Sequence, residues 1–176
     1  PTDSVLREID LAGTTIRELK VTELAQKMQN AGFDFVPNSF HHDILPLDNG
    51  HLIVLTDFSR DFTDLPGYPG TTHVIGDGIV DLDADWNPVW AWNSFDYLDV
   101  NRHLFGLPDW THSNALVYSP GDGDLLLSVR HQSWDLKIDY NNGAGTGNVL
   151  WRLGYQGDFA LTENSVPSDD PGGWFS

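Results

Sequence analysis

The sequence contains no cysteine. This absence excludes disulfide bonds, thiolate catalysis and cysteine-based zinc or iron–sulfur sites. Basic residues are also few, because nine lysines and arginines stand against 26 aspartates and glutamates, for a formal net charge of −17. A chain of this charge repels nucleic acid and anionic membrane surfaces, so we expect neither as a partner. No stretch approaches the roughly 18 consecutive apolar residues that a membrane-spanning helix requires.

The residues that are present are typical of a folded all-β protein. A length of 176 residues suits one domain, and a hydrophobic fraction of 40% with seven tryptophans and nine phenylalanines excludes a disordered chain. Seventeen glycines and ten prolines divide the sequence into many short segments, which favours strands and turns. No signal peptide is visible and the sequence begins at Pro1, so we expect a processed chain or a portion of a longer one.

The stretch richest in chemistry is Asp109–Gln132, which reads DWTHSNALVYSPGDGDLLLSVRHQ. Two apolar runs, Ala115–Tyr118 and Leu125–Val129, flank a Pro-Gly-Asp-Gly turn and predict a β-hairpin. Because a hairpin returns the chain to its starting end, the polar residues at both strand ends are expected to lie close together. These residues are His112, Asn114, Arg130, His131 and Gln132. Their guanidinium and imidazole groups can bind an anion, although ordinary polar strand ends would show the same composition.

Near the N-terminus the sequence predicts a hairpin followed by one short helix. The hairpin covers Glu8–Leu19, and the helix covers Thr22–Asn30 with Thr22 as its N-cap. Apolar residues recur from Val21 at helical spacing, and Gly32 is placed to end the helix. This is the only substantial helix that we expect.

The remaining strands are predicted as hairpins separated by loops. The predicted hairpins are Phe40–Phe58, which begins with two histidines, Val74–Leu82 with Pro88–Trp92, and Leu136–Tyr140 with Asn148–Leu153. The predicted loops are Ser59–Thr72, Asn93–Pro108 and Gly154–Ser176. Within this pattern His51, His73 and His103 are expected to be surface or loop residues.

An internal repeat predicts the architecture. Ile-Asp-Leu at 9–11, Val-Asp-Leu at 80–82 and Ile-Asp-Tyr at 138–140 each precede a turn and another strand, and a His-initiated hairpin lies between successive copies. The repeating unit is therefore a four-stranded antiparallel sheet, the blade of a β-propeller, with Trp90 and Trp151 as blade core. The chain divides into an outer hairpin and helix at 1–39, a blade at 40–93, a linker at 94–108, a blade at 109–154 and a loop at 155–176. Because propellers need roughly four to eight blades, we expect an incomplete propeller.

Three stretches resemble the bacterial arylsulfate sulfotransferase family, which works without a nucleotide sulfate donor. They read FHHDILPLDNGHLIVL, DWTHSNALVYSPGDGDLLLSVRHQ and NVLWRLGYQGDF, and the resemblance runs from about Ile9 to about Phe159. It implies a six-bladed propeller with a central active site and no cofactor, in the periplasm or secreted. It implies transfer of a sulfuryl group from a phenolic sulfate ester to a phenol through a sulfated histidine. The implied partners are these small molecules and the remainder of the propeller, from the same or another chain, with a homodimer possible.

The resemblance also assigns roles to individual residues. It implies catalytic roles for His112, Arg130 and the His41–His42 pair, and substrate binding by Asn114 and His131. Counting back from the turns favours His41 opposite His112, although a slip of one residue would place His42 there. Tyr118, Trp110 and Trp134 are candidates for holding the aryl ring. The nucleophilic histidine of the family lies in a Gln-His element after the acidic loop that DPGGWF resembles, so we expect it just beyond residue 176.

Three alternatives compete with this interpretation. A metal site could form where His41, His42 and His112 converge, although no HxxxH or HxH spacing occurs and Arg130 would repel a cation. A calcium loop could use Asp81, Asp83 and Asp85, but tryptophans replace the required glycine and glutamate, which favours an acidic turn. A non-catalytic propeller with a degenerate active site is the third, since fold alone does not determine function. We expect no metal.

Overall fold

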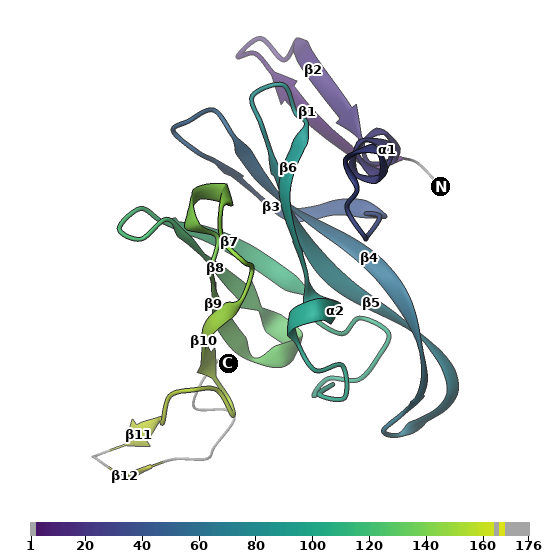
Figure 1. The fold of residues 1–176 in the computed structure, drawn as a ribbon, viewed down its shortest axis with the longest axis vertical. Helices are drawn as coiled ribbons and strands as arrows, with labels where there is room; N and C mark the ends of the chain where they lie inside the picture. Colours follow the sequence, from purple (N-terminus) through teal and green to yellow (C-terminus); the bar gives the residue numbers. More distant parts are fainter. Residues whose placement is uncertain (1–2, 164–165, 168–176) are drawn as a thin grey trace.

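Two four-stranded antiparallel sheets dominate the computed structural model, which describes residues 3–163 and 166–167 (Figure 1). The first sheet contains β3 (Ser39–Pro46), β4 (Leu52–Leu65), β5 (Tyr68–Leu82) and β6 (Pro88–Asn93). The second contains β7 (Ser113–Ser119), β8 (Asp124–Val129), β9 (Trp134–Ile138) and β10 (Val149–Gly154). In each sheet neighbouring strands are consecutive in the chain, as in a propeller blade. The predictions of an all-β fold and of a four-stranded repeat are confirmed.

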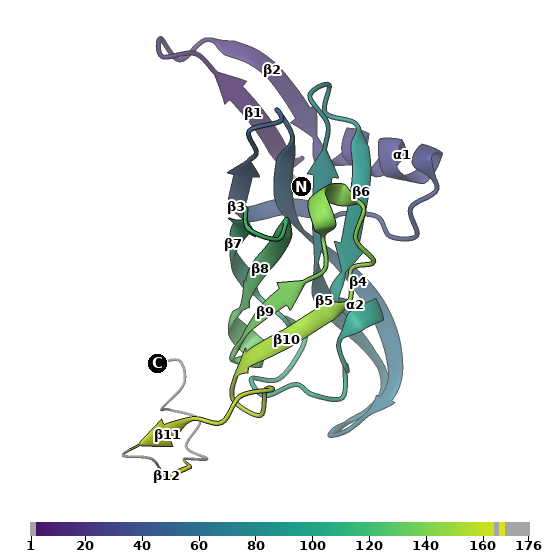
Figure 2. The same cartoon turned by 60° about the vertical axis from the view of Figure 1, so that its left-hand side comes forward.

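The first strands of the two sheets, β3 and β7, lie next to each other (Figure 2). A separate hairpin of β1 (Val5–Ile9) and β2 (Thr15–Lys20) precedes them and leads into α1 (Val21–Ala31). The other elements are short: α2 (Ser94–Tyr97), η1 (Arg130–Gln132), η2 (Asn141–Gly143), and the paired strands β11 (Thr162–Glu163) and β12 (Val166–Pro167). In the part of the chain that the structure describes, every helix is too short or too polar to cross a bilayer.

Helix α1 begins earlier than the sequence pattern predicts. Its N-cap is Lys20, and Thr22 lies inside the first turn, where its hydroxyl donates to Asp3 Oδ2 at 2.7 Å. The prediction of Thr22 as N-cap is therefore wrong, because this hydroxyl finds a partner outside the helix. The apolar stripe is confirmed, since Val21, Leu24 and Met28 are buried. Gly32 ends the helix in the left-handed conformation at φ 86°, as expected.

The predicted loop at 59–72 is instead a β-ribbon. Strands β4 and β5 continue beyond their sheet and pair with each other from Ser59 opposite Ile75 to Leu65 opposite Tyr68. Proline is tolerated here because a register shift between Thr63 and Leu65 interrupts the ladder beside it. The predicted linker contains α2, and the predicted C-terminal loop contains β11 and β12; its residues 168–176 lie outside the described part.

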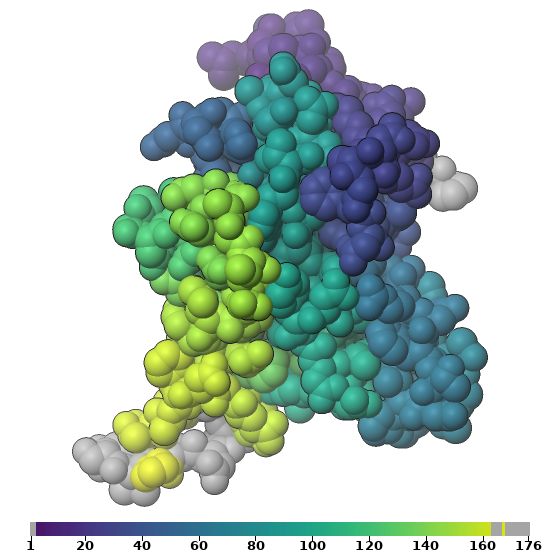
Figure 3. Space-filling model, viewed as in Figure 1, coloured from purple at the N-terminus to yellow at the C-terminus, as the bar shows by residue number. Residues whose placement is uncertain are grey.

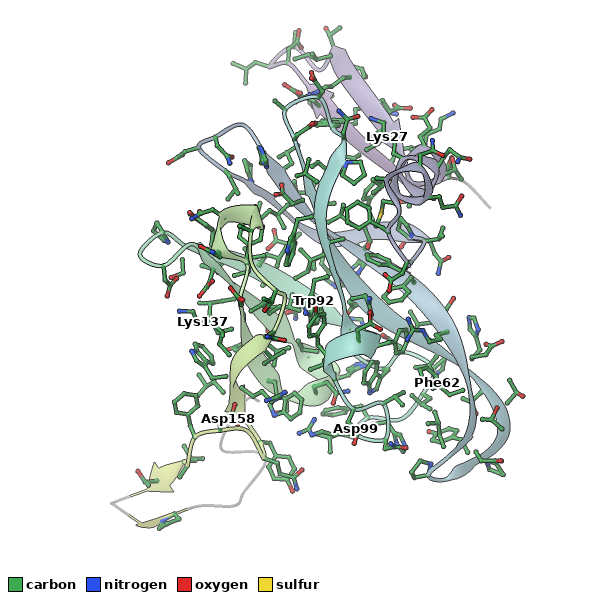
Figure 4. All side chains as sticks on the ribbon, in the orientation of Figure 1. Lys27, Phe62, Trp92, Asp99, Lys137 and Asp158 are labelled. Carbon is green, nitrogen blue, oxygen red and sulfur yellow. The ribbon has the colours of Figure 1, made fainter. Side chains whose placement is uncertain are left out.

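The core between the sheets is mainly aliphatic and includes tryptophans that also join the sheets. The Trp90 and Trp92 indoles of β6 donate to the Gly145 and Gly147 carbonyls at 3.1 and 3.0 Å. Trp92 lies between the sheets (Figure 4), and the loop before β10 packs against β6 and α2 in the space-filling view (Figure 3). Trp90 is core, as predicted. Trp151 is only half-buried and its ring meets Phe159, so its assignment to the core is wrong.

The aspartates of the calcium alternative serve the fold. Asp81 is fully buried and accepts hydrogen bonds from the Tyr140 hydroxyl at 2.7 Å and from His51 Nδ1 at 3.0 Å. Asp83 accepts the backbone N–H groups of Asp85 and Asn87, which makes the acidic turn that the sequence favours. His51 lies in the loop before β4, as expected, and its ring is half-buried through its bond to Asp81. His73 lies in β5, but its side chain is exposed, which agrees with the expectation of a surface residue.

We predict that Trp92→Phe destabilises the protein. The variant keeps an aromatic ring but leaves the buried Gly147 carbonyl without its donor. We expect the free energy of unfolding to fall by about 1–3 kcal/mol, measured by urea denaturation. The matched control is Val89→Thr, an exposed position on the same strand, where we expect a change below about 0.5 kcal/mol. Equal midpoints for the two variants would contradict the prediction.

Candidate active site

Four histidines meet where β3 and β7 begin and β8 ends. His41 and His42 lie in β3, His112 directly precedes β7, and His131 lies in η1 directly after β8. Their ring centroids are separated by 5.2 Å for His41–His42, 5.1 Å for His42–His112 and 4.7 Å for His112–His131. We call this set the histidine row. The two histidine-initiated hairpins thus bring their polar ends together across neighbouring sheets.

Backbone irregularities aim these side chains. His42 and His112 both adopt a left-handed conformation, with φ of 51° and 49°, which is uncommon for residues other than glycine. Each stands beside a register shift, between Phe40 and Ile44 in one sheet and around Ser113 in the other. The shared conformation and the contact between the two rings match His42 with His112, the alternative that a slip of one residue allowed, rather than His41. Counting back from the turn fails because the bulge inserts extra residues.

A cleft of about 260 Å³ is lined by three histidines of the row, His41, His42 and His112, and by Asp57, Asp77 and Asp109. Asp109 is placed by backbone pairing with β5, because Ile75 N–H donates to the Pro108 carbonyl at 2.7 Å and Trp110 N–H donates to the Ile75 carbonyl at 2.9 Å. The start of the Asp-Trp-Thr-His motif is therefore bonded to the first sheet, and its Asp109 and Trp110 carbonyls accept from His131 and Gln132 at the end of β8. We call this cavity the histidine cleft.

Asp77 orients His41. The carboxylate is almost fully buried, lies 3.3 Å from His41 Nε2 and accepts the Ser113 N–H at 2.5 Å. Burial alone would lower the pKa of His41, but the nearby Asp77 carboxylate outweighs it, so the pKa lies above its usual range. Burial alone would raise the pKa of Asp77, but His41 and Ser113 hold it below its usual range. The Nδ1 atoms of His41 and His42 are 3.0 Å apart, so one of them carries the proton.

Asp109 orients two further imidazoles. Its Oδ2 accepts from His112 Nδ1 at 2.6 Å, and its backbone carbonyl accepts from His131 Nδ1 at 2.7 Å. Both Nδ1 atoms therefore carry hydrogen, which leaves each Nε2 to accept or donate a proton. Sequence reasoning missed Asp77 and Asp109, although the spacing of Asp109 three residues before His112 was a usable signal.

The structure groups different residues from those that the metal alternative proposed. Among the described residues, the group with ligand atoms within 4.8 Å of one another is Asp109, His112 and His131, not His41, His42 and His112. Two imidazoles and a carboxylate are donors that first-row transition metals accept. In this structure both Nδ1 atoms are occupied by hydrogen bonds to Asp109, which explain the grouping without an ion.

Arg130 and Asn114 line a second cleft of about 440 Å³ together with Phe105 and Trp134. We call it the arginine cleft. His131 connects the two clefts, because its ring stacks on His112 on one side and on Phe105, at 5.5 Å between centroids, on the other. The six residues singled out from the sequence are therefore neighbours, but they divide between adjoining cavities.

Arg102 holds the turn that carries Arg130 and His131. Its guanidinium donates to the Gln132 carbonyl at 2.7 Å and to the Tyr155 carbonyl at 2.8 Å, and it lies 3.8 Å from the centre of the Trp134 ring. Burial lowers the pKa of Arg102 to about 10. Sequence reasoning missed this residue because it treated 94–108 as a plain linker.

The structure separates the three aromatic candidates. Trp110 is almost fully buried and stacks on Phe95, while the Tyr118 hydroxyl donates to Asn142 Oδ1 at the far end of β7. Neither side chain lines either of the two clefts. Trp134 does line the arginine cleft, although Arg102 covers one face of its ring.

We predict that Asp77→Asn lowers the pKa of His41. The asparagine carbonyl can still accept the Ser113 N–H, but the charge that favours protonated His41 is gone. An NMR titration of the imidazole C–H signals should show the fall, with Asp61→Asn on the exposed ribbon as a control that leaves His41 unchanged. An unaltered His41 pKa in Asp77→Asn would contradict the assignment.

The His41–Asp77 pair makes the free energy of unfolding depend on pH. Its stabilisation is fully present between the ordinary pKa values of 3.8 for aspartate and 6.5 for histidine. It is lost as pH rises through the raised pKa of His41, and it is lost as pH falls through the lowered pKa of Asp77.

Comparison with known families agrees with the motifs. The family described as Arylsulfotransferase (ASST) matches residues 2–166, a range that includes both four-stranded sheets and every residue of the histidine row. A comparison with curated proteins gives no match. The family match covers far more than half of the sequence and agrees with the sheet architecture. The chain therefore belongs to the arylsulfotransferase (ASST) family.

Proposed function

We propose that the protein transfers a sulfuryl group from a phenolic sulfate ester to a phenol acceptor through a sulfohistidine. Members of its family are arylsulfate sulfotransferases. The observation that carries the proposal for this chain is the histidine row, held by Asp77 and Asp109 and adjoining the cleft that Arg130 lines. This arrangement combines anion binding with groups that transfer protons near neutral pH.

Arg130 is the residue that we assign to the sulfate oxygens. Sulfuryl transfer, like phosphoryl transfer, passes through a loose transition state with charge on the peripheral oxygens, so positioning and charge stabilisation dominate catalysis. Each of the other arginines has an ion pair or hydrogen bond within the described residues: Arg7, Arg17, Arg60, Arg102 and Arg152. Arg130 is exposed at its cleft and has no side-chain partner among those residues, so its donors are available. Asn114 adds an amide to the same cleft.

His112 is the residue that we assign to proton transfer. Its Nδ1–H is committed to Asp109, so Nε2 can donate a proton to the departing phenolate and later accept one from the incoming phenol. In the first transfer the S–O bond of the donor breaks as an S–N bond to the nucleophilic histidine forms. In the second the S–N bond breaks as the S–O bond to the acceptor forms. We keep the nucleophile in the Gln-His element that the family resemblance implies.

His41 and His42 support the charge of the site. The raised pKa of His41 favours its protonated form, which adds positive charge at the histidine cleft. The contact between its Nδ1 and that of His42 allows one proton to be shared between the rings. His131 donates its Nδ1–H to the Asp109 carbonyl, and its ring lies between those of His112 and Phe105.

We expect Arg130→Ala to abolish sulfuryl transfer while leaving the fold intact. Loss of one stabilising donor at a developing oxyanion costs about 3–4 kcal/mol, or roughly 10²–10³ in rate. The assay uses the complete protein with a chromogenic aryl sulfate and a phenol acceptor, and circular dichroism checks folding. The control is Arg7→Ala on β1, which is exposed and ion-paired with Glu18. Full activity of Arg130→Ala would remove the anion-binding assignment.

We expect Asp109→Asn to lower kcat by about 10²–10⁴ with little change in KM, as for other carboxylates that fix a catalytic imidazole. The amide NH₂ of asparagine can donate to Nδ1, which would move the His112 proton to Nε2. The measurement is a steady-state comparison of the two parameters across pH. A fall confined to KM, with kcat unchanged, would show that Asp109 serves binding rather than the tautomer of His112.

A further inference from the structure

The arginine cleft contains an aromatic residue that the sequence motifs do not mark. Phe105 belongs to the segment between the sheets and is 68% exposed, yet it lines the cleft with Arg130 and Asn114. A single exposed phenylalanine needs no explanation by itself. Here one side of its ring is stacked on His131 at an interplanar angle of 30°. The ring therefore contacts the histidine row on one side and borders the cleft.

The segment that carries Phe105 is fastened on both sides. Before Phe105, Arg102 donates to the Gln132 and Tyr155 carbonyls. After Phe105, the Leu107 N–H donates to the Tyr68 hydroxyl at 3.2 Å. Gly106 between them adopts φ of 86°, and a Cβ at this position would come within 3.2 Å of the Tyr68 hydroxyl, so the position suits glycine. An aromatic ring held before a ligand arrives loses little conformational entropy on binding.

The cleft offers hydrogen-bond donors to one anionic group. Arg130 supplies a positive charge and Asn114 supplies amide donors, while the Asp135 carboxylate in the wall offsets part of that charge. A volume of about 440 Å³ is within the range of small-molecule sites and is larger than a sulfate ion needs. Phe105 and Trp134 line the same cleft as Arg130, and these aromatic side chains suit a flat apolar ring.

We propose that Phe105 is a specificity-determining residue of the arginine cleft, where it packs against the aryl ring of a sulfate ester. The proposal rests on the proposed function for the identity of the anion. Phe105 sets the preference for aryl over alkyl sulfates. Because Phe105 stacks on His131, a ligand ring that packs against Phe105 lies near the histidine row. Trp134 borders the cleft, but its ring is partly covered by Arg102, so Phe105 is the main aromatic contact.

The test measures binding rather than turnover. Benzenesulfonate carries the aromatic ring and the anionic group, but its sulfur is bonded to carbon, so the sulfonate group cannot be transferred. Methanesulfonate has the same anionic group without the ring. Their affinities for the protein are measured by calorimetry or NMR titration with Phe105→Ala, Arg130→Ala and the control Leu104→Ala, a neighbouring residue that is 43% exposed. We expect Phe105→Ala to weaken benzenesulfonate about tenfold and to leave methanesulfonate unchanged. Leu104→Ala should change neither, and Arg130→Ala should weaken both.

Two results would overturn this role of Phe105. One is an equal effect of Phe105→Ala and Leu104→Ala on benzenesulfonate, and the other is an equal loss of both ligands in Phe105→Ala. Rescue of benzenesulfonate binding by Phe105→Tyr but not by Phe105→Leu would support an aromatic contact. Failure of the proposed function looks different, because Phe105-dependent binding of benzenesulfonate in a complete protein without transfer activity would support the role of Phe105 and contradict the reaction.

Discussion

The buried carboxylate of Asp77 is the interaction on which both the fold and the site depend. It lies on β5 of the first sheet, yet it accepts the Ser113 N–H of β7 and lies within ion-pair distance of His41. A buried charge without partners would be costly, so this position is stable only while both sheets and the imidazole stay in place. The placement of the second sheet and the charge of the histidine row are thereby coupled. Asp43, which accepts the Leu116 N–H at 2.7 Å, makes a second bond of the same kind.

A chain with a net charge of −17 repels an anionic ligand at long range. Contacts near the two clefts reduce this repulsion. Asp77 lies 3.3 Å from His41 Nε2, and the Nδ1–H groups of His112 and His131 both point at Asp109. Both carboxylates line the histidine cleft, but Asp77 also raises the pKa of His41, which favours a positive ring there. Arg102 binds the Gln132 carbonyl and so holds the η1 turn, whereas Arg130 in the same turn lines the cleft and is available for a ligand.

Much of the architecture could be predicted because turns and strands follow from the order of residues within short segments. The turn at Pro-Gly-Asp-Gly, the alternation of apolar residues and the repeated Asp-turn-Trp hairpins correspond to β7–β10 and to most of β3–β6. The errors have different causes. Thr22 donates to Asp3, which is 19 residues away, instead of capping α1. Pro66 and Pro69 suggested a loop, but Pro66 lies in the turn and Pro69 opposite the register shift, so β4 and β5 still pair through the ribbon.

The residues alone predict most of the strands, their order in two sheets, the excess of negative charge and the members of the histidine row, because strand period, turn chemistry and motif are local properties. Which side chains meet depends on the folded structure. It matched His42 rather than His41 with His112, placed Arg130 in a cleft beside the row, and brought in Asp77, Arg102 and Phe105 from other elements. The physical reason is that these contacts cross between sheets, where packing, bulges and buried hydrogen bonds fix positions that no spacing within one segment encodes.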